Sequence, residues 1–153
     1  MKIFIGADHG GFELKEKIKE FLSKNKYDFE DTGNTVFDKI DDYPDFAIAL
    51  AKNVVSTPES KGIMICGSGV GACIVANKIR GIRASVCHDT YSAHQGVEHD
   101  SMNLLCLGGR IIGYELAFEI VKAFADATFS NEERHIRRLR KVAQLEDPFG
   151  GLR

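Results

Sequence analysis

A cysteine stands where an apolar run meets a glycine-rich loop. Residues 64–72 read MICGSGVGA, so Cys66 is followed by Gly67, Gly69 and Gly71. Backbone N–H groups that converge in such a loop can hold an anion or an oxyanion, and glycine lets them approach closely. The same surroundings lower the pKa of a nearby thiol, which makes Cys66 a candidate base or nucleophile. Cys66 could equally be the last buried residue of a strand, and the spacing leaves both interpretations open.

A dinucleotide-binding loop is a second interpretation of these glycines. Gly67, Gly69 and Ala72 fit the loose fingerprint, and Asp89 follows at about the offset of a ribose ligand. However, the loop follows the third expected strand rather than the first. The chain also has no room for a second nucleotide-binding half and a substrate domain. A small-anion or oxyanion site is therefore favoured.

Two further groups of residues could bind ligands. Arg134 and Arg138 are four residues apart and share a helical face, and guanidinium groups match phosphate oxygens well. A solvated basic face remains the alternative interpretation of these arginines.

Histidines and carboxylates also gather at His88, Asp89, His94, Glu98 and His99. No His-Glu-x-x-His pattern is present, so we predict no metal site.

Composition limits the classes of protein that can position these residues. The 153 residues are 44% hydrophobic and 27% charged, which predicts one globular domain, residues 1–153. A net charge of −2 does not favour nucleic acid or an anionic membrane as a partner. The apolar runs are too short for a membrane span, and four cysteines without a signal peptide indicate free thiols in the cytoplasm.

Short apolar runs alternate with amphipathic segments along the whole chain. This alternation predicts an α/β fold: a Rossmann-like, doubly wound, five-stranded parallel sheet with helices on both faces. The expected strands are 2–8, 27–32, 61–66, 82–87 and 103–107, and the expected helices are 10–24, one from residue 44, 71–79, 91–99, one around 116–124 and one over about 131–145. A capping box from Ser130 to Glu133 should open the last helix, and the tail 148–153 should be loose.

Ligands of such sheets bind beyond the carboxyl ends of the strands. The candidate residues at those ends are Asp8, His9, Gly33, Cys66 to Gly71, His88, Asp89 and Gly108 to Arg110. The order of the elements thus predicts that Cys66 and its loop face a ligand at this edge.

Several short motifs resemble one known family, the type B ribose-5-phosphate isomerases, which are grouped with the galactose-6-phosphate isomerase subunits. The motifs are GADHGG at 6–11, DYP at 42–44, ICGSGVG at 65–71, ANK at 76–78, GIR at 81–83, LGGR at 107–110 and Arg134-His135 with Arg138. The resemblance covers nearly the whole chain. It implies a dimeric enzyme that interconverts aldose and ketose sugar phosphates through a cis-enediolate, without metal or organic cofactor.

The resemblance also assigns roles to individual residues. It makes Cys66 the base that moves the proton between C1 and C2, with Ser68 where the family usually has threonine, and it makes His99 the group that opens the sugar ring. Asp8 and His9 would bind sugar hydroxyls and phosphate, and Arg134 and Arg138 would clamp the phosphate. The complete set of predicted substrate-binding residues is Asp8, His9, Tyr43, Gly67, Gly69, Val70, Gly71, Asp100, Arg110, Arg134 and Arg138.

The position of His99 predicts a composite site. If a helix of about ten residues returns from the carboxyl edge after Cys87, then His99 lies about 15 Å from that edge. His99 could not reach Cys66 of its own chain, so we expect a partner subunit to supply it. This agrees with the dimeric sites of the resembled family. The sequence leaves open whether dimers pair into tetramers.

One departure from the family pattern leaves the sugar open. The chain has His99-Asp-Ser-Met-Asn103 where the family commonly has His-Asn-Asp-Ala-Asn. Asp100, when ionised, only accepts hydrogen bonds, whereas an amide also donates. The preferred pair could be ribose 5-phosphate and ribulose 5-phosphate, as in the pentose phosphate pathway, or a tetrose or hexose phosphate. A non-catalytic module that binds a sugar phosphate or nucleotide, and a redox switch at Cys66, are the alternatives of other classes.

Overall fold

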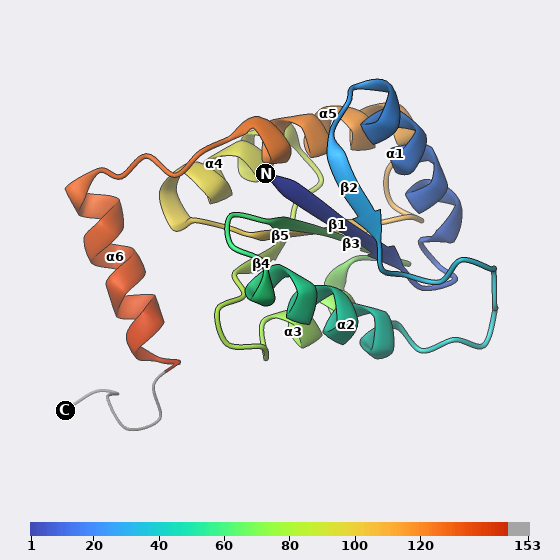
Figure 1. The fold of residues 1–153 in the computed structure, drawn as a ribbon, viewed down its shortest axis with the longest axis horizontal. Coiled ribbons are helices and arrows are strands. Elements are labelled where there is room, and N and C mark those ends of the chain that lie inside the picture. Colours follow the sequence, from blue (N-terminus) through green and yellow to red (C-terminus); the bar gives the residue numbers. More distant parts are fainter. Residues whose placement is uncertain (147–153) are drawn as a thin grey trace.

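Five parallel strands form one sheet in the order β2-β1-β3-β5-β4 (Figure 1). The computed structural model describes residues 1–146, and the predicted loose tail at 148–153 lies outside them. The strands are β1 (Lys2–Ala7), β2 (Asp28–Asp31), β3 (Lys61–Cys66), β4 (Ala84–Val86) and β5 (Leu104–Gly108). Every pair in the ladder is parallel, which confirms the predicted fold class.

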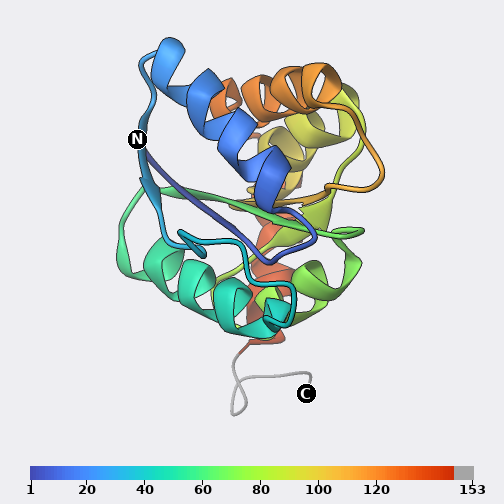
Figure 2. The same cartoon turned by 90° about the vertical axis from the view of Figure 1, so that its right-hand side faces the viewer.

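Helices cover both faces of the sheet. They are α1 (Phe12–Lys24), α2 (Tyr43–Ser56), α3 (Val70–Ala76), α4 (Thr90–Asp100), α5 (Tyr114–Asp126) and α6 (Glu133–Gln144). Helices α1, α4 and α5 pack on one face, and α2 and α3 pack on the other (Figure 2). The strand order reverses between β1 and β3, so the crevice expected at such a switch point lies at their carboxyl ends.

Successive side chains of β3 point to opposite faces of the sheet, so they enter different helix layers. Ile63 and Ile65 belong to the core shared with α1, α4 and α5, whereas Met64 and Cys66 belong to the core shared with α2 and α3. The Cys66 side chain therefore points toward the α2 and α3 layer.

Helix α6 lies to one side of the layered body (Figure 1). Its buried residue is His135. The predicted capping box is wrong, because α6 begins at Glu133 and its N-cap, Glu132, has no side-chain cap bond. The hydroxyl of Ser130 instead pairs with Nδ1 of His135 at 2.6 Å, and Asn131 has a left-handed backbone (φ 56°) that interrupts a helical path.

Candidate active site

Glycines bring the loops after β1, β3 and β5 into direct backbone contact. A Cβ atom on Gly10 would lie 2.8 Å from the nitrogen of Gly67, and one on Gly109 would lie 2.6 Å from the oxygen of Gly10. The N–H of Gly109 donates to the carbonyl of Cys66 at 2.8 Å. Side chains at these positions would separate the loops, so the glycines hold three strand ends together around Cys66.

These loops enclose a cavity of about 330 Å³. It is lined by Asp8, Tyr43, Cys66, Gly67, Ser68, Gly71, Arg110 and Ile111. The sequence predicted all of these residues except Ile111, which directly follows Arg110 and carried no signal of its own. Cys66 is only 5% exposed and also contributes to the core beside α2 and α3. Cys66 therefore ends a buried strand and also lines a cavity, and its role as a base or nucleophile stays a prediction.

The glycine loop points a donor at the sulfur itself. The N–H of Gly69 donates to Sγ of Cys66 at 3.1 Å. Gly69 has a φ of 83°, which favours glycine and turns the chain into α3. Val70, which begins α3, is 53% exposed and does not line the cavity.

Asp8 and His9 follow β1, and His9 is held by an aspartate that the sequence did not single out. Nδ1 of His9 lies 2.6 Å from Oδ1 of Asp41, and the N–H of His9 donates to the same oxygen at 3.0 Å. This contact raises the pKa of His9, and burial raises the pKa of Asp8. Asp41 lies in a loop rich in aspartate, and its sequence pattern indicates only a loop or helix-cap residue. The contact with His9 follows from the fold.

Arg110 and Tyr43 close over the glycine loop. The N–H of Arg110 donates to the carbonyl of Gly67 at 3.1 Å, and its guanidinium lies 3.5 Å from where a Cβ of Gly67 would be. The Tyr43 ring would be 2.8 Å from a Cβ on Gly71. Gly67 and Gly71 thus admit a cation and an aromatic ring close to the backbone.

The remaining predicted residues form a separate group on α4 and α6. The rings of His99 and His135 are 4.1 Å apart, and Nδ1 of His99 lies 2.7 Å from Nε2 of Gln95. Burial lowers the pKa of His135. Asp100 and Arg138 line a cavity of about 530 Å³ that α6 also borders, and Arg134 pairs with Glu132 at 2.8 Å. None of these residues lines the Cys66 cavity.

The structure does not support the two alternative interpretations, a dinucleotide-binding loop with Asp89 as ribose ligand and a metal site on α4. The carboxylate of Asp89 accepts from the N–H of Ser92 at 2.7 Å and caps α4, so this capping bond accounts for Asp89 without a ribose. Within residues 1–146, the His, Cys and carboxylate groups close enough to share a metal ion are Asp8, His9 and Asp41. Glu98 lies 3.6 Å from both His94 and His99, but these three side chains are not among the described groups compact enough to share one ion.

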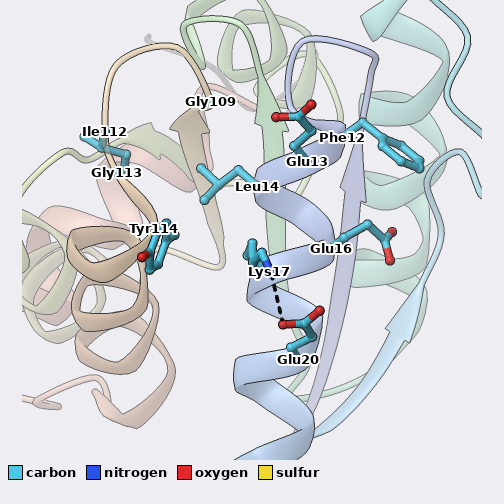
Figure 3. Close-up of a pocket in the computed structure, with 10 residues that line it drawn as sticks. All are labelled: Phe12, Glu13, Leu14, Glu16, Lys17, Glu20, Gly109, Ile112, Gly113 and Tyr114. Carbon is cyan, nitrogen blue, oxygen red and sulfur yellow. Dashed lines mark hydrogen bonds and ion pairs between the residues drawn. The ribbon is translucent and has the colours of Figure 1, made fainter.

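Two further cavities are larger than the one at Cys66 but have fewer side chains that could act in catalysis. One, of about 510 Å³, lies between α1 and the start of α5, where Lys17 pairs with Glu20 at 3.5 Å (Figure 3). The other, of about 840 Å³, includes Ser60 and Asn103 near the amino ends of β3 and β5. Neither has a cysteine or histidine in its lining. The smaller cavity at Cys66 is therefore the better candidate.

Comparison with known proteins shows the family of this chain. The sequence model of the Ribose/Galactose Isomerase family matches residues 3–142. The chain belongs to this family. As a member of the ribose/galactose isomerases it is an isomerase, which confirms the predicted class of enzyme. No described helix is both long and apolar enough to cross a membrane.

Three relatives show how similar this chain is to known proteins in sequence and, for two of them, in structure. The structure of ribose-5-phosphate isomerase B from Clostridium thermocellum is 43% identical, has a TM-score of 0.92, and is matched over 97% of this chain and 99% of that one. The Mycoplasma genitalium enzyme, solved with bound ribulose-5-phosphate, is 39% identical with a TM-score of 0.89 over 95% of each chain. D-erythrulose-4-phosphate isomerase of Pectobacterium atrosepticum is 41% identical over 84% of this chain and 85% of that protein.

Proposed function

We propose that this isomerase interconverts the aldose and ketose forms of a sugar phosphate, with ribose 5-phosphate and ribulose 5-phosphate as the first candidate pair. The observation that carries the proposal is the sulfur of Cys66, which lines a cavity together with Asp8, Ser68 and Arg110 and accepts an N–H bond. The names of the relatives, and the ribulose-5-phosphate bound to one of them, support the class of substrate.

The proposed reaction is a proton transfer between adjacent carbons. Cys66, as a thiolate, removes the proton from C2 of the open-chain aldose and becomes a thiol, and the substrate becomes an enediolate. A proton also passes from O2 to O1 of the enediolate, and the thiol returns its proton to C1, which completes the ketose. N–H donors of the loop and the Ser68 hydroxyl stabilise the developing oxyanion, and each well-placed donor is worth about 3 kcal/mol. No step requires a metal or an organic cofactor.

The remaining residues bind and orient the sugar phosphate. Asp8, a buried acceptor at the cavity wall, suits the hydroxyl groups, and His9, whose pKa is raised by Asp41, suits an anion. The further proposed contacts at this edge are Tyr43, Gly67, Gly69, Val70, Gly71 and Arg110. These positions would hold the reacting carbons against Cys66.

We further propose that a second copy of the chain completes the site with His99, Asp100, Arg134 and Arg138. His99 lies at the far end of α4, on the opposite face of the sheet from the Cys66 side chain. Two apolar side chains of α3, Val70 and Ile74, are exposed, and a partner would cover them. The resulting unit would be a homodimer with composite sites.

A tetrose phosphate is a second candidate substrate. Asp100 replaces an amide that is common in the family, which changes the hydrogen bonds available to a sugar hydroxyl. The relative from Pectobacterium atrosepticum is named for D-erythrulose 4-phosphate. Any test of the substrate should therefore include a tetrose 4-phosphate as well as the pentose phosphates. A hexose 6-phosphate is the third candidate.

A panel of four-, five- and six-carbon aldose and ketose phosphates in D₂O tests the proposal. The enzyme should incorporate deuterium at C1 or C2 of one pair and convert aldose to ketose, and proton NMR would follow both. The sugar with the largest kcat/KM identifies the substrate. Absence of exchange and conversion with every sugar would overturn the proposed function.

The Cys66→Ala variant separates an isomerase from a binding module. We expect kcat to fall by about 10²–10⁴-fold, because the base is lost, while calorimetry still detects sugar-phosphate binding. The matched control is Cys87→Ala, since Cys87 is also buried but lies outside the cavity. Full turnover by Cys66→Ala would remove Cys66 from the mechanism.

A further inference from the structure

The ring of His99 is held by neighbours on two helices. Gln95 and His99 are four residues apart on α4 and share a face of the helix, and Nε2 of Gln95 lies 2.7 Å from Nδ1 of His99. The ring of His135, from α6, packs against the His99 ring with the ring centres 4.1 Å apart. His135 is itself fixed, because it is only 1% exposed and its Nδ1 lies 2.6 Å from the hydroxyl oxygen of Ser130. These contacts restrict the orientation of the His99 ring.

The contact with Gln95 determines which ring nitrogen of His99 carries the proton. An amide nitrogen can only donate, so Nδ1 accepts and, in the neutral ring, the proton is on Nε2. A carboxylate favours the same form, since Oε2 of Glu98 lies 3.6 Å from Nε2 of His99. That separation is too long for a hydrogen bond, so the N–H at Nε2 stays available. The His99 side chain is 31% exposed, so a ligand can reach it.

We propose that Gln95 is a positioning residue that keeps the proton of neutral His99 on Nε2, so that His99 offers a hydrogen-bond donor to the ring oxygen of a cyclic pentose phosphate. This inference rests on the proposed function, which brings His99 to a sugar phosphate. When the bond between C1 and the ring oxygen O4 breaks, negative charge develops on O4, and a donor at this oxygen lowers the barrier. The proton of the C1 hydroxyl passes through water to O4, and C1 becomes the carbonyl carbon of the open chain.

The two sugars of the first candidate pair differ in their need for this step. Ribose 5-phosphate closes into a five-membered ring through its O4 hydroxyl. Ribulose 5-phosphate has its carbonyl at C2, and the oxygen that would close a five-membered ring, O5, is bound to phosphorus. Proton exchange at C1 of ribulose 5-phosphate therefore needs the base but no ring opening. A change at Gln95 should slow the turnover of ribose 5-phosphate and spare this exchange.

The Gln95→Glu variant reverses the proposed contact, because a carboxylate can only accept. At about pH 9, where an ordinary histidine is neutral, the carboxylate should draw the proton of His99 to Nδ1 and leave Nε2 as an acceptor. Nitrogen-15 NMR of the imidazole should find the proton on Nε2 in the wild type, on Nδ1 in Gln95→Glu, and distributed between the two nitrogens in Gln95→Met. The His99→Asn variant identifies the His99 signals. A wild-type proton on Nδ1 would overturn the proposal.

Steady-state kinetics provides the second readout. With ribose 5-phosphate at about pH 9, kcat of Gln95→Glu should fall about 10²-fold, the loss of one oxyanion donor, while KM changes little. Gln95→Met removes the contact without reversing the tautomer and should lose less. Deuterium exchange at C1 of ribulose 5-phosphate should remain close to the wild type in both variants. As a matched control, Gln144→Glu makes the same change at an exposed position of α6 and should leave both rates unchanged.

The outcomes separate this inference from the proposed function. If the wild type neither converts ribose 5-phosphate nor exchanges deuterium, the proposed function fails and the ring-opening role of His99 falls with it. If the wild type is active but Gln95→Glu and Gln95→Met lose equal activity, Gln95 only maintains packing, and the inference alone is overturned. A matching loss of ribulose 5-phosphate exchange in Gln95→Glu would overturn it as well.

Discussion

The contact between His9 and Asp41 determines how the candidate site responds to pH. The Asp41 carboxylate stabilises the protonated imidazole and so raises the pKa of His9 above its ordinary value. A raised pKa means that the positive charge is fully present below the ordinary value and is lost only as the pH rises through the raised one. The proposed phosphate contact of His9 would therefore keep its positive charge at a pH where a free histidine is neutral.

The Asp41→Asn variant should shift this response to lower pH. We expect the His9 resonances in an NMR titration to move toward the ordinary histidine pKa, and the KM for the sugar phosphate to rise at a lower pH than in the wild type. Titration of the substrate phosphate is the same in both proteins, so the difference between them reports His9. Superimposable His9 titrations would contradict the proposed effect of Asp41.

Lys61 links two elements and shows how a buried cation stabilises the fold. It begins β3, and its ammonium donates to the carbonyls of Phe124, Ala125 and Ala127 at 2.7, 3.0 and 2.7 Å, where α5 ends. Burial lowers the pKa of Lys61 to about 8. The ammonium supplies donors to carbonyls that lack helical partners, and it adds positive charge at the negative end of the helix.

Replacement of Lys61 by methionine should destabilise the protein strongly. The methionine keeps much of the side-chain volume but leaves three carbonyls without this donor, which should lower the free energy of unfolding by about 2–4 kcal/mol. Thermal or urea unfolding would measure the change. As a control, Lys122→Met removes an exposed pair with Asp126 on the same helix and should cost about 0.5 kcal/mol. Similar losses in both variants would contradict the role of the buried contact.

Side chains that reach between elements explain where the predicted boundaries were wrong. Helix α3 ends at Ala76, before the expected residue 79, and Asn77 then exchanges two hydrogen bonds with Ala84 at 2.8 and 2.9 Å. These bonds hold the start of β4, which is also shorter than expected. The type and order of the elements followed from local periodicity, but their ends depend on contacts between segments.

A composite site makes a prediction that only the whole assembly can test. If one chain supplies Cys66 and its partner supplies His99, then Cys66→Ala and His99→Asn proteins should be inactive alone but complement each other. Random pairing makes half of the dimers mixed, each with one intact site of two, so about one quarter of wild-type activity should return. Co-refolding followed by the isomerase assay measures this.

The reciprocal mixture distinguishes the two arrangements. A chain that carries both Cys66→Ala and His99→Asn, paired with the wild type, should have no intact site if the residues come from different chains. If each chain supplies both residues, this mixed dimer keeps one active site, and the first mixture stays inactive. Light scattering on the wild type would establish whether dimers or tetramers form.

The sequence alone determined the features that depend on residues close together along the chain, namely the fold class and the loop at Cys66. Periodicity gave the parallel α/β fold, because side-chain direction repeats locally, and the types and spacing in Cys66 to Gly71 indicated a thiol beside an anion-holding loop. The family motifs added the class of reaction, which the family match confirms. The cytoplasmic location and the roles of single residues remain predictions.

The tertiary structure decided which distant residues meet. It placed Asp41 beside His9, Lys61 at the end of α5, and His99 on the opposite face of the sheet from Cys66. The physical reason is that these residues lie at least 32 positions apart along the chain. Local pattern does not encode such pairings, because they depend on the strand order and on the face of the sheet that each helix covers.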